Sequence, residues 1–171
     1  MIRTNNAFYT LFFIDFGLVW LFYNQATYLY ISFTTKHPII GTLLFASVNS
    51  QQGYAQLYRD DLESLTYTII YLAPGDLPWT SYPTVKNKKA VLRMKTLIMV
   101  EELCKGLPSP FCKFVNYVHS LGFDEKPDYQ HLCSILLQCS ETVNDEPIKA
   151  PSLYTCPNFT VNSIPISTGW M

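Results

Sequence analysis

The chain has 171 residues, of which 49% are hydrophobic, 15% aromatic and 15% charged, and its net charge is −1 at neutral pH. This length and apolar content predict a globular domain with a sizeable core and exclude a disordered chain. The near-neutral charge gives no indication of nucleic acid or an anionic membrane as a partner.

Cysteine usage indicates a reducing compartment and hence a cytoplasmic or nuclear location. The five cysteines form no CxxC pair, and their odd number leaves one outside any disulfide framework. Cys104, Cys112 and Cys133 lie in apolar, helix-like contexts, where a reduced thiol behaves as a small hydrophobe. We therefore expect buried thiols, and neither a zinc site nor a catalytic cysteine.

Residues 1–14 are expected to form a terminal strand region. Residues 9–14 (YTLFFI) are rich in aromatic and β-preferring side chains, which predicts a buried strand. The wider apolar stretch 7–23 resembles a membrane span, but Asp15 interrupts it, and a carboxylate at that depth is costly. A membrane anchor is therefore the weakest hypothesis for this stretch.

Residues 15–49 have no clear periodicity. Gly17, Pro38 and Gly41 punctuate them, so a long connecting segment is expected. Long loops inside compact domains usually carry function.

Residues 50–139 are expected to form a helical body. Asp60 followed by Glu63 matches a capping box, which predicts a helix from Asp60 that Pro74-Gly75 ends. Apolar residues recur there at helical spacing and predict one buried stripe: Leu62, Leu65, Ile69, Ile70 and Ala73.

Further helical patterns follow along the chain. Residues 86–103 predict one or two helices with their basic residues outside, and residues 140–171, rich in proline, predict an irregular tail. Helices are also expected over 109–121 and from about Asp128, and they are predicted to bury Phe111, Phe114, Val115, Val118, Leu121, Leu132, Ile135 and Leu136.

Several motifs occur in a specific order. The stretch 14–18 reads IDFGL, and Gly41-Thr42 precedes residues 46–49 (ASVN). Further on come these stretches: RDDLESL (59–65), LPW (77–79), ELCKGLP (102–108) and FDEKPDY (123–129). Taken together, residues 9–137 resemble the casein kinase I family of serine/threonine protein kinases.

The resemblance implies a mainly α fold, namely a protein-kinase-like C-terminal lobe with helices F to I and an activation segment over 15–49. It implies that Asp15 is the ligand of the Mg²⁺ that holds ATP. It also implies that Thr42 lies at the substrate side of the activation segment, and that Asp61 is the buried aspartate that anchors the catalytic loop. The alternatives are a turn residue for Asp15, a loop-satisfying hydroxyl for Thr42 and a helix-dipole charge for Asp61.

The small lobe and the catalytic loop have no counterpart in the sequence. It contains no GxGxxG loop, no VAIK-like lysine and no HRD triplet, so ATP and Mg²⁺ are implied by the family rather than supported by a set of ligands. The family activity is ATP-dependent phosphorylation of serine or threonine in protein substrates. We expect this chain alone to be inactive, either as a partial kinase domain or as a non-catalytic, pseudokinase-like module that binds protein partners.

Two positions depart from the family pattern. Leu44 replaces an arginine of the anion site for phosphorylated substrates, and Thr66 replaces a glycine on a tightly packed helix. Lys86, Lys88 and Lys89 keep some basic charge in the region that normally supplies such a site, although exposed lysines are more often a solvated face.

Overall fold

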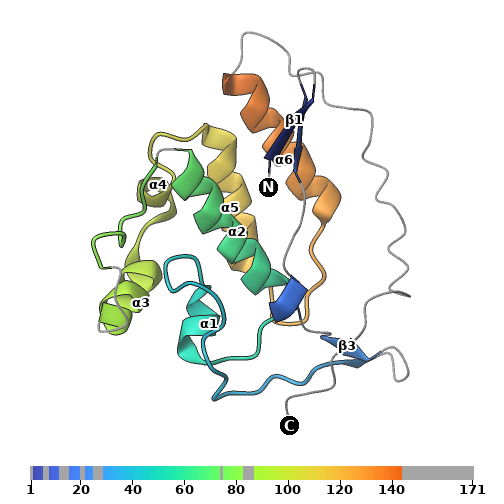
Figure 1. The fold of residues 1–171 in the computed structure, drawn as a ribbon, viewed down its shortest axis with the longest axis vertical. Helices are drawn as coiled ribbons and strands as arrows, with labels where there is room; N and C mark the ends of the chain where they lie inside the picture. Colours follow the sequence, from blue (N-terminus) through green and yellow to red (C-terminus); the bar gives the residue numbers. More distant parts are fainter. Residues whose placement is uncertain are drawn as a thin grey trace.

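The computed structural model describes residues 2–5, 8–11, 16–19, 22–24, 29–73, 75–82 and 87–143. Within these residues the protein is mainly helical, as predicted, and its strands are short (Figure 1). Helices α2 and α5 lie at the centre of the molecule, with α6 packed against α5.

The N-terminal strands form a hairpin. Strand β1 (Ile2–Asn5) pairs antiparallel with β2 (Phe8–Leu11), so that Ile2 lies opposite Leu11. The predicted strand over 9–14 is therefore present but begins at Phe8, and residues 12–15 lie outside the described part of the chain. The 3-10 turn η1 (Phe16–Leu18) and a small pair of strands, β3 (Tyr23–Asn24) with β4 (Leu29–Tyr30), follow.

Helix α1 (Val48–Gln52) begins inside the ASVN motif. Ser47 caps it, because its hydroxyl accepts the N–H of Ser50 at 3.0 Å. Gly53 ends the helix with a φ of 79°, and a Cβ at this position would lie 3.2 Å from the carbonyl oxygen of His37. Only glycine combines that left-handed conformation with so close a neighbour.

Helix α2 (Tyr58–Leu72) begins earlier than predicted. Its N-cap residue is Leu57, whereas Asp60 lies at the third helical position and accepts the N–H of Leu57 at 3.0 Å. The carboxylate thus reaches back to the start of the helix, as the acidic member of a capping box does. The predicted end before Pro74-Gly75 is confirmed.

The predicted apolar stripe on α2 is only half right. Leu62 and Ile70 are buried, but Leu65 is 44% exposed and Ala73 is also exposed. The buried face of α2 differs from the predicted one because α1 and the loop before it pack against a side of the helix that carries polar and aromatic residues. The additional buried residues are Asp60, Glu63, Thr66 and Tyr67.

The remaining helices match their predicted positions. Residues 86–103 contain two helices, α3 (Lys88–Leu97) and α4 (Val100–Leu103). Helix α5 (Ser109–Ser120) and the following Leu121 bury all five of the predicted apolar side chains. Helix α6 (Tyr129–Val143) buries Leu132 and Ile135 and extends past residue 139, so the predicted start of the tail at 140 lies inside it. Residues 144–171 lie outside the described part of the chain.

The core lies where α2, α5 and α6 meet and includes Leu77 and Trp79 of the LPW motif. Trp79 is fully buried, and its ring meets that of Tyr67 edge to face, with 4.9 Å between the ring centroids. Val115 from α5 and Ile135 from α6 close the same cluster. Aromatic burial therefore connects the turn after α2 with the main helical body.

The thiol prediction holds in part. Cys104 is buried and Cys112 half-buried, but Cys133 is exposed on the outer face of α6; these three and Cys139 are free. None of the helices described here is both long and apolar enough to cross a bilayer.

Candidate functional site

The three residues singled out by the family resemblance do not form a described cluster. Asp15 lies outside the described residues. Thr42 is exposed and begins a turn, where its carbonyl accepts the N–H groups of Phe45 at 2.9 Å and Ala46 at 3.0 Å. The assignment of Thr42 to a surface-facing segment therefore agrees with its exposure, while its role stays a prediction.

The burial that the resemblance implied for Asp61 is wrong, while its role as the anchor of a catalytic loop stays a prediction. Asp61 is exposed, and its neighbour Asp60 is buried with 1% of its surface accessible. Partial desolvation and the charge of Asp60 raise the pKa of Asp61. The correction follows from helix geometry, because successive residues point about 100° apart and only one of the two can face α1.

Asp60 joins the loop before α1 to the start of α2. Its Oδ1 accepts the Ser47 hydroxyl at 2.8 Å and the Asn49 amide at 3.1 Å, while its Oδ2 accepts the backbone N–H of Leu57 at 3.0 Å. Arg59 adds a charge at 3.7 Å from Oδ2. A carboxylate buried to this extent needs such donors, since leaving it unsatisfied would cost several kcal/mol.

Glu63 forms a second connection between the same two helices. Its Oε1 accepts the N–H of Val48 at 3.0 Å and the hydroxyl of Tyr67 at 2.6 Å. Val48 begins α1, so this carboxylate lies at the positive end of that helix. Burial, followed by the charge and hydrogen bond of Glu63, raises the pKa of the Tyr67 hydroxyl, which therefore stays a donor.

Lys95 holds the 43–46 turn from the opposite side. Although α3 was predicted to keep its basic residues outside, Lys95 is buried with 4% exposure. Its Nζ donates to the carbonyl oxygens of Ala46 at 2.6 Å and Leu43 at 3.1 Å. It also lies 4.5 Å from the ring centroid of Tyr67 and 5.0 Å from that of Trp79, within cation–π range.

Burial lowers the pKa of Lys95 to about 7, against the opposing attraction of Glu63. The lysine is therefore poised between its charged and neutral forms near neutral pH. Gln51 adds to the hydrogen bonds of Lys95, because its side-chain amide donates to the same carbonyls of Leu43 and Ala46, at 3.3 and 3.1 Å.

Both departures from the family pattern fit the packing. The indole N–H of Trp79 donates to the carbonyl of Leu44 at 2.9 Å, so the backbone of that residue is used whatever its side chain is. Thr66 is fully buried, and its hydroxyl donates to the carbonyl of Leu62 at 2.9 Å. A threonine is therefore accommodated on the packed face of α2 without an unsatisfied group.

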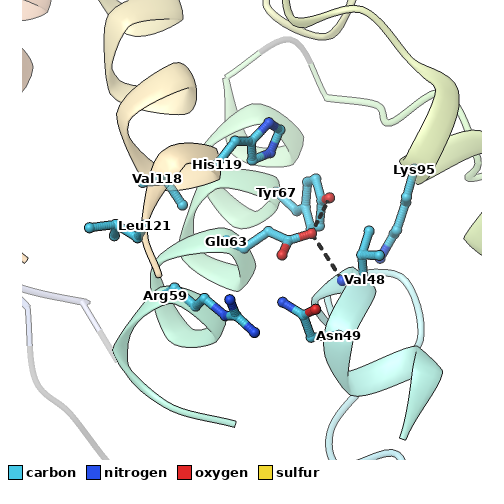
Figure 2. A pocket seen from close by; sticks show the side chains of 9 residues that line it. All are labelled: Val48, Asn49, Arg59, Glu63, Tyr67, Lys95, Val118, His119 and Leu121. Atoms are coloured by element: carbon cyan, nitrogen blue, oxygen red, sulfur yellow. Dashed lines mark hydrogen bonds between the residues drawn. The ribbon is translucent and has the colours of Figure 1, made fainter. Parts of the chain in front are cut away.

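These elements surround an open cleft of about 280 Å³ (Figure 2). Helix α2 contributes Arg59 and Glu63, the end of α5 contributes His119, and α1 contributes Asn49. The complete set of lining residues is Val48, Asn49, Arg59, Glu63, Tyr67, Lys95, Val118, His119 and Leu121. Charged groups of both signs thus share one cleft with apolar walls.

An aromatic cluster lies at the start of α2, around Tyr58. Tyr58 meets the rings of Phe22 and Tyr129 edge to face, at centroid distances of 4.6 and 6.4 Å. Desolvation, followed by a hydrogen bond with Tyr30, raises the pKa of Tyr58 to about 12. The Tyr58 hydroxyl therefore stays protonated near neutral pH.

Sequence reasoning missed Asp60, Glu63 and Lys95 as functional positions. Lys95 lies four residues after Val91, which is buried on the same face of α3, so the periodicity contained a signal for its burial. The residue type argued against burial, and only the carbonyls of a loop distant in sequence make it possible.

Neither a metal nor a known family is identified for this site. Within the described ranges, no group of three or more histidine, cysteine, aspartate or glutamate side chains is placed to hold a metal ion. No protein-family model matches the chain. The roles predicted for Asp15, Mg²⁺ and ATP therefore stay predictions.

The neighbours Asp60 and Asp61 provide a matched test of the corrected assignment. In Asp60→Asn an amide NH₂ must face a donor, since both carboxylate oxygens accept hydrogen bonds. We expect a loss of about 2–4 kcal/mol in the free energy of unfolding for Asp60→Asn, and less than about 1 kcal/mol for Asp61→Asn. Urea unfolding measures both, and equal effects would contradict the assignment.

The burial of Lys95 should make the free energy of unfolding depend on pH in an unusual way. Its folded pKa of about 7 lies below the value of 10.5 expected in the unfolded chain, so the unfolded state binds more protons between these values. Burying the charged ammonium lowers the free energy of unfolding by its full amount below pH 7. This loss becomes smaller as the pH rises toward 10.5, because the folded protein then holds the lysine in its neutral form.

Relative to Lys95→Met, the free energy of unfolding of the wild type should therefore rise by about 2 kcal/mol between about pH 7 and pH 9. Chemical unfolding of both proteins across this range measures the difference. Parallel pH profiles for the two proteins would show that Lys95 stays charged in the folded state.

Proposed function

We propose that the chain is the C-terminal lobe of a casein-kinase-I-like protein kinase, a lobe that presents the 41–46 segment to a protein substrate. Phosphorylation of serine or threonine is the activity this family implies. The residues of this chain would provide the platform for the substrate rather than a complete catalytic centre.

The convergence of separately recognised motifs is the observation that carries the proposal. Ser47 and Asn49 come from the ASVN stretch, and both donate to Asp60 of the RDDLESL stretch. Trp79 of the LPW stretch donates to the carbonyl of Leu44, only two residues before ASVN. Motifs placed together by chance would have no reason to satisfy one another's buried polar groups.

The other motifs support the same proposal through packing. The ELCKG stretch contributes Leu103 and Cys104 to the core, and the FDEKPDY stretch leads directly into α6. These residues build a scaffold, and the scaffold holds the segment that the family uses for substrates.

The 41–46 segment is suited to present a fixed backbone. Its carbonyls at Leu43, Leu44 and Ala46 are all held by buried side-chain donors, so the turn is tied to the core. Thr42 remains exposed at its start. A bound peptide would thus meet a preformed surface, which reduces the entropy lost on binding.

A second candidate function is a non-catalytic module that binds protein partners. It is favoured by the apolar side chains that the segment before α1 leaves in solvent. Leu18 is 66% exposed, Val19 60% and Phe33 50%. Exposed apolar groups that gather in one segment often mark an interaction surface.

A chimeric enzyme separates the two functions. The small lobe and catalytic loop of an active casein kinase I would be fused upstream of Phe8, so that residues 8–143 replace the C-terminal lobe of that enzyme. We expect transfer of labelled phosphate from ATP to casein, and a loss of at least about 100-fold in the Asp15→Asn chimera, because that change removes the proposed metal ligand. The unfused chain should show no transfer.

The chimera also defines the contrary result. A chimera that is folded by near-ultraviolet circular dichroism, but no more active than its Asp15→Asn control, would contradict the kinase-lobe proposal. That outcome would leave the binding module as the function to pursue.

A further inference from the structure

The cleft between α1, α2 and the end of α5 contains an unusual arrangement of charge. Arg59 and Glu63 are four residues apart on α2 and extend from the same face of the helix (Figure 2). Residues at this spacing commonly form an ion pair. Among the described residues, however, the ion pair of Arg59 is with Asp60, at 3.7 Å, and not with Glu63.

Arg59 and Glu63 each contact other groups instead of one another. The guanidinium of Arg59 lies 5.6 Å from the ring centroid of Phe123, and its buried Nε has no hydrogen-bond partner. Glu63 is 7% exposed, and the hydrogen bonds that hold it within the described part of the chain, from Val48 and Tyr67, both use Oε1. A cationic donor and a carboxylate oxygen therefore line the same cleft without satisfying each other.

This arrangement selects the charge of a ligand. A simple anion would be attracted by Arg59 and Lys95 but repelled by Glu63 and by the nearby Asp60, and a simple cation would meet the reverse. A zwitterion avoids both penalties, because its carboxylate can face the guanidinium and its ammonium can face the free oxygen of Glu63.

The size and the walls of the cleft suit a small organic molecule. Its volume of about 280 Å³ is close to the lower end of the range usual for ligand pockets. Val48, Val118 and Leu121 provide apolar walls. Polar groups make up most of the exposed lining, and the apolar walls are the part that a hydrocarbon side chain would contact.

We propose that this cleft binds a free α-amino acid with an aliphatic side chain, through its carboxylate at Arg59 and its ammonium at Glu63. The inference does not depend on the kinase-lobe proposal, since neither ATP nor Asp15 contributes to it.

Matched ligands test the proposal on the wild-type chain. L-valine carries both charges, N-acetyl-L-valine only the carboxylate and L-valinamide only the ammonium. Calorimetric titration should give a millimolar or tighter dissociation constant for L-valine, and binding at least about tenfold weaker for each derivative. No binding of L-valine, or equal binding of all three, would overturn the proposal and leave the cleft as a water-filled space.

The variant Glu63→Gln isolates the free oxygen. Glutamine keeps an Oε1 that can accept from Val48 and Tyr67, but it places an NH₂ donor where Oε2 stood. L-valine binding should fall at least about tenfold, while Glu101→Gln, the same change on the exposed surface of α4, should leave it unchanged.

Undiminished binding of L-valine by Glu63→Gln would overturn the assignment. If that variant does not fold, Arg59→Met decides instead, and it should weaken L-valine and N-acetyl-L-valine but not L-valinamide.

Discussion

The buried carboxylate of Asp60 is the constraint on which the rest of the described structure depends. A carboxylate with 1% exposure is tolerated only where several donors converge on it, and here they come from Ser47, Asn49 and the start of α2 itself. These hydrogen bonds fix the loop before α1 against α2. Once that loop is fixed, Val48 is placed to donate to Glu63, and α1 packs against α2.

The 43–46 turn is held in a comparable way, by side-chain donors that satisfy its carbonyl groups. A half-buried turn without a regular ladder of hydrogen bonds must find donors for its inward-facing carbonyls elsewhere. Lys95, Gln51 and Trp79 supply them from three different parts of the chain. The surface proposed to meet a substrate is therefore defined by polar groups inside the protein, and the cleft beside it is a consequence of the same packing.

Much of the fold was predictable from the sequence, but the polar network was not. Helical periodicity located α5 and its buried face because its apolar residues recur on consecutive turns and form a single stripe. The same periodicity predicted the wrong buried face for α2, because it did not anticipate the burial of Glu63 and Thr66. Glu63 accepts a hydrogen bond from Val48, which is distant in sequence, and Thr66 donates to a backbone carbonyl of its own helix. Asp61 is assigned by its position in the motif that resembles the family, whereas the packing of this chain buries its neighbour Asp60.

A double-mutant cycle between Ser47 and Asp60 tests this account most directly. The free energies of unfolding of Ser47→Ala, Asp60→Ala and the double variant give the coupling between the two side chains, separate from the helix cap that Ser47 also provides. We expect a coupling of about 1–2 kcal/mol, as for a buried hydrogen bond to a charged acceptor. Additive effects, with a coupling near zero, would contradict the claim that this carboxylate joins the ASVN and RDDLESL stretches.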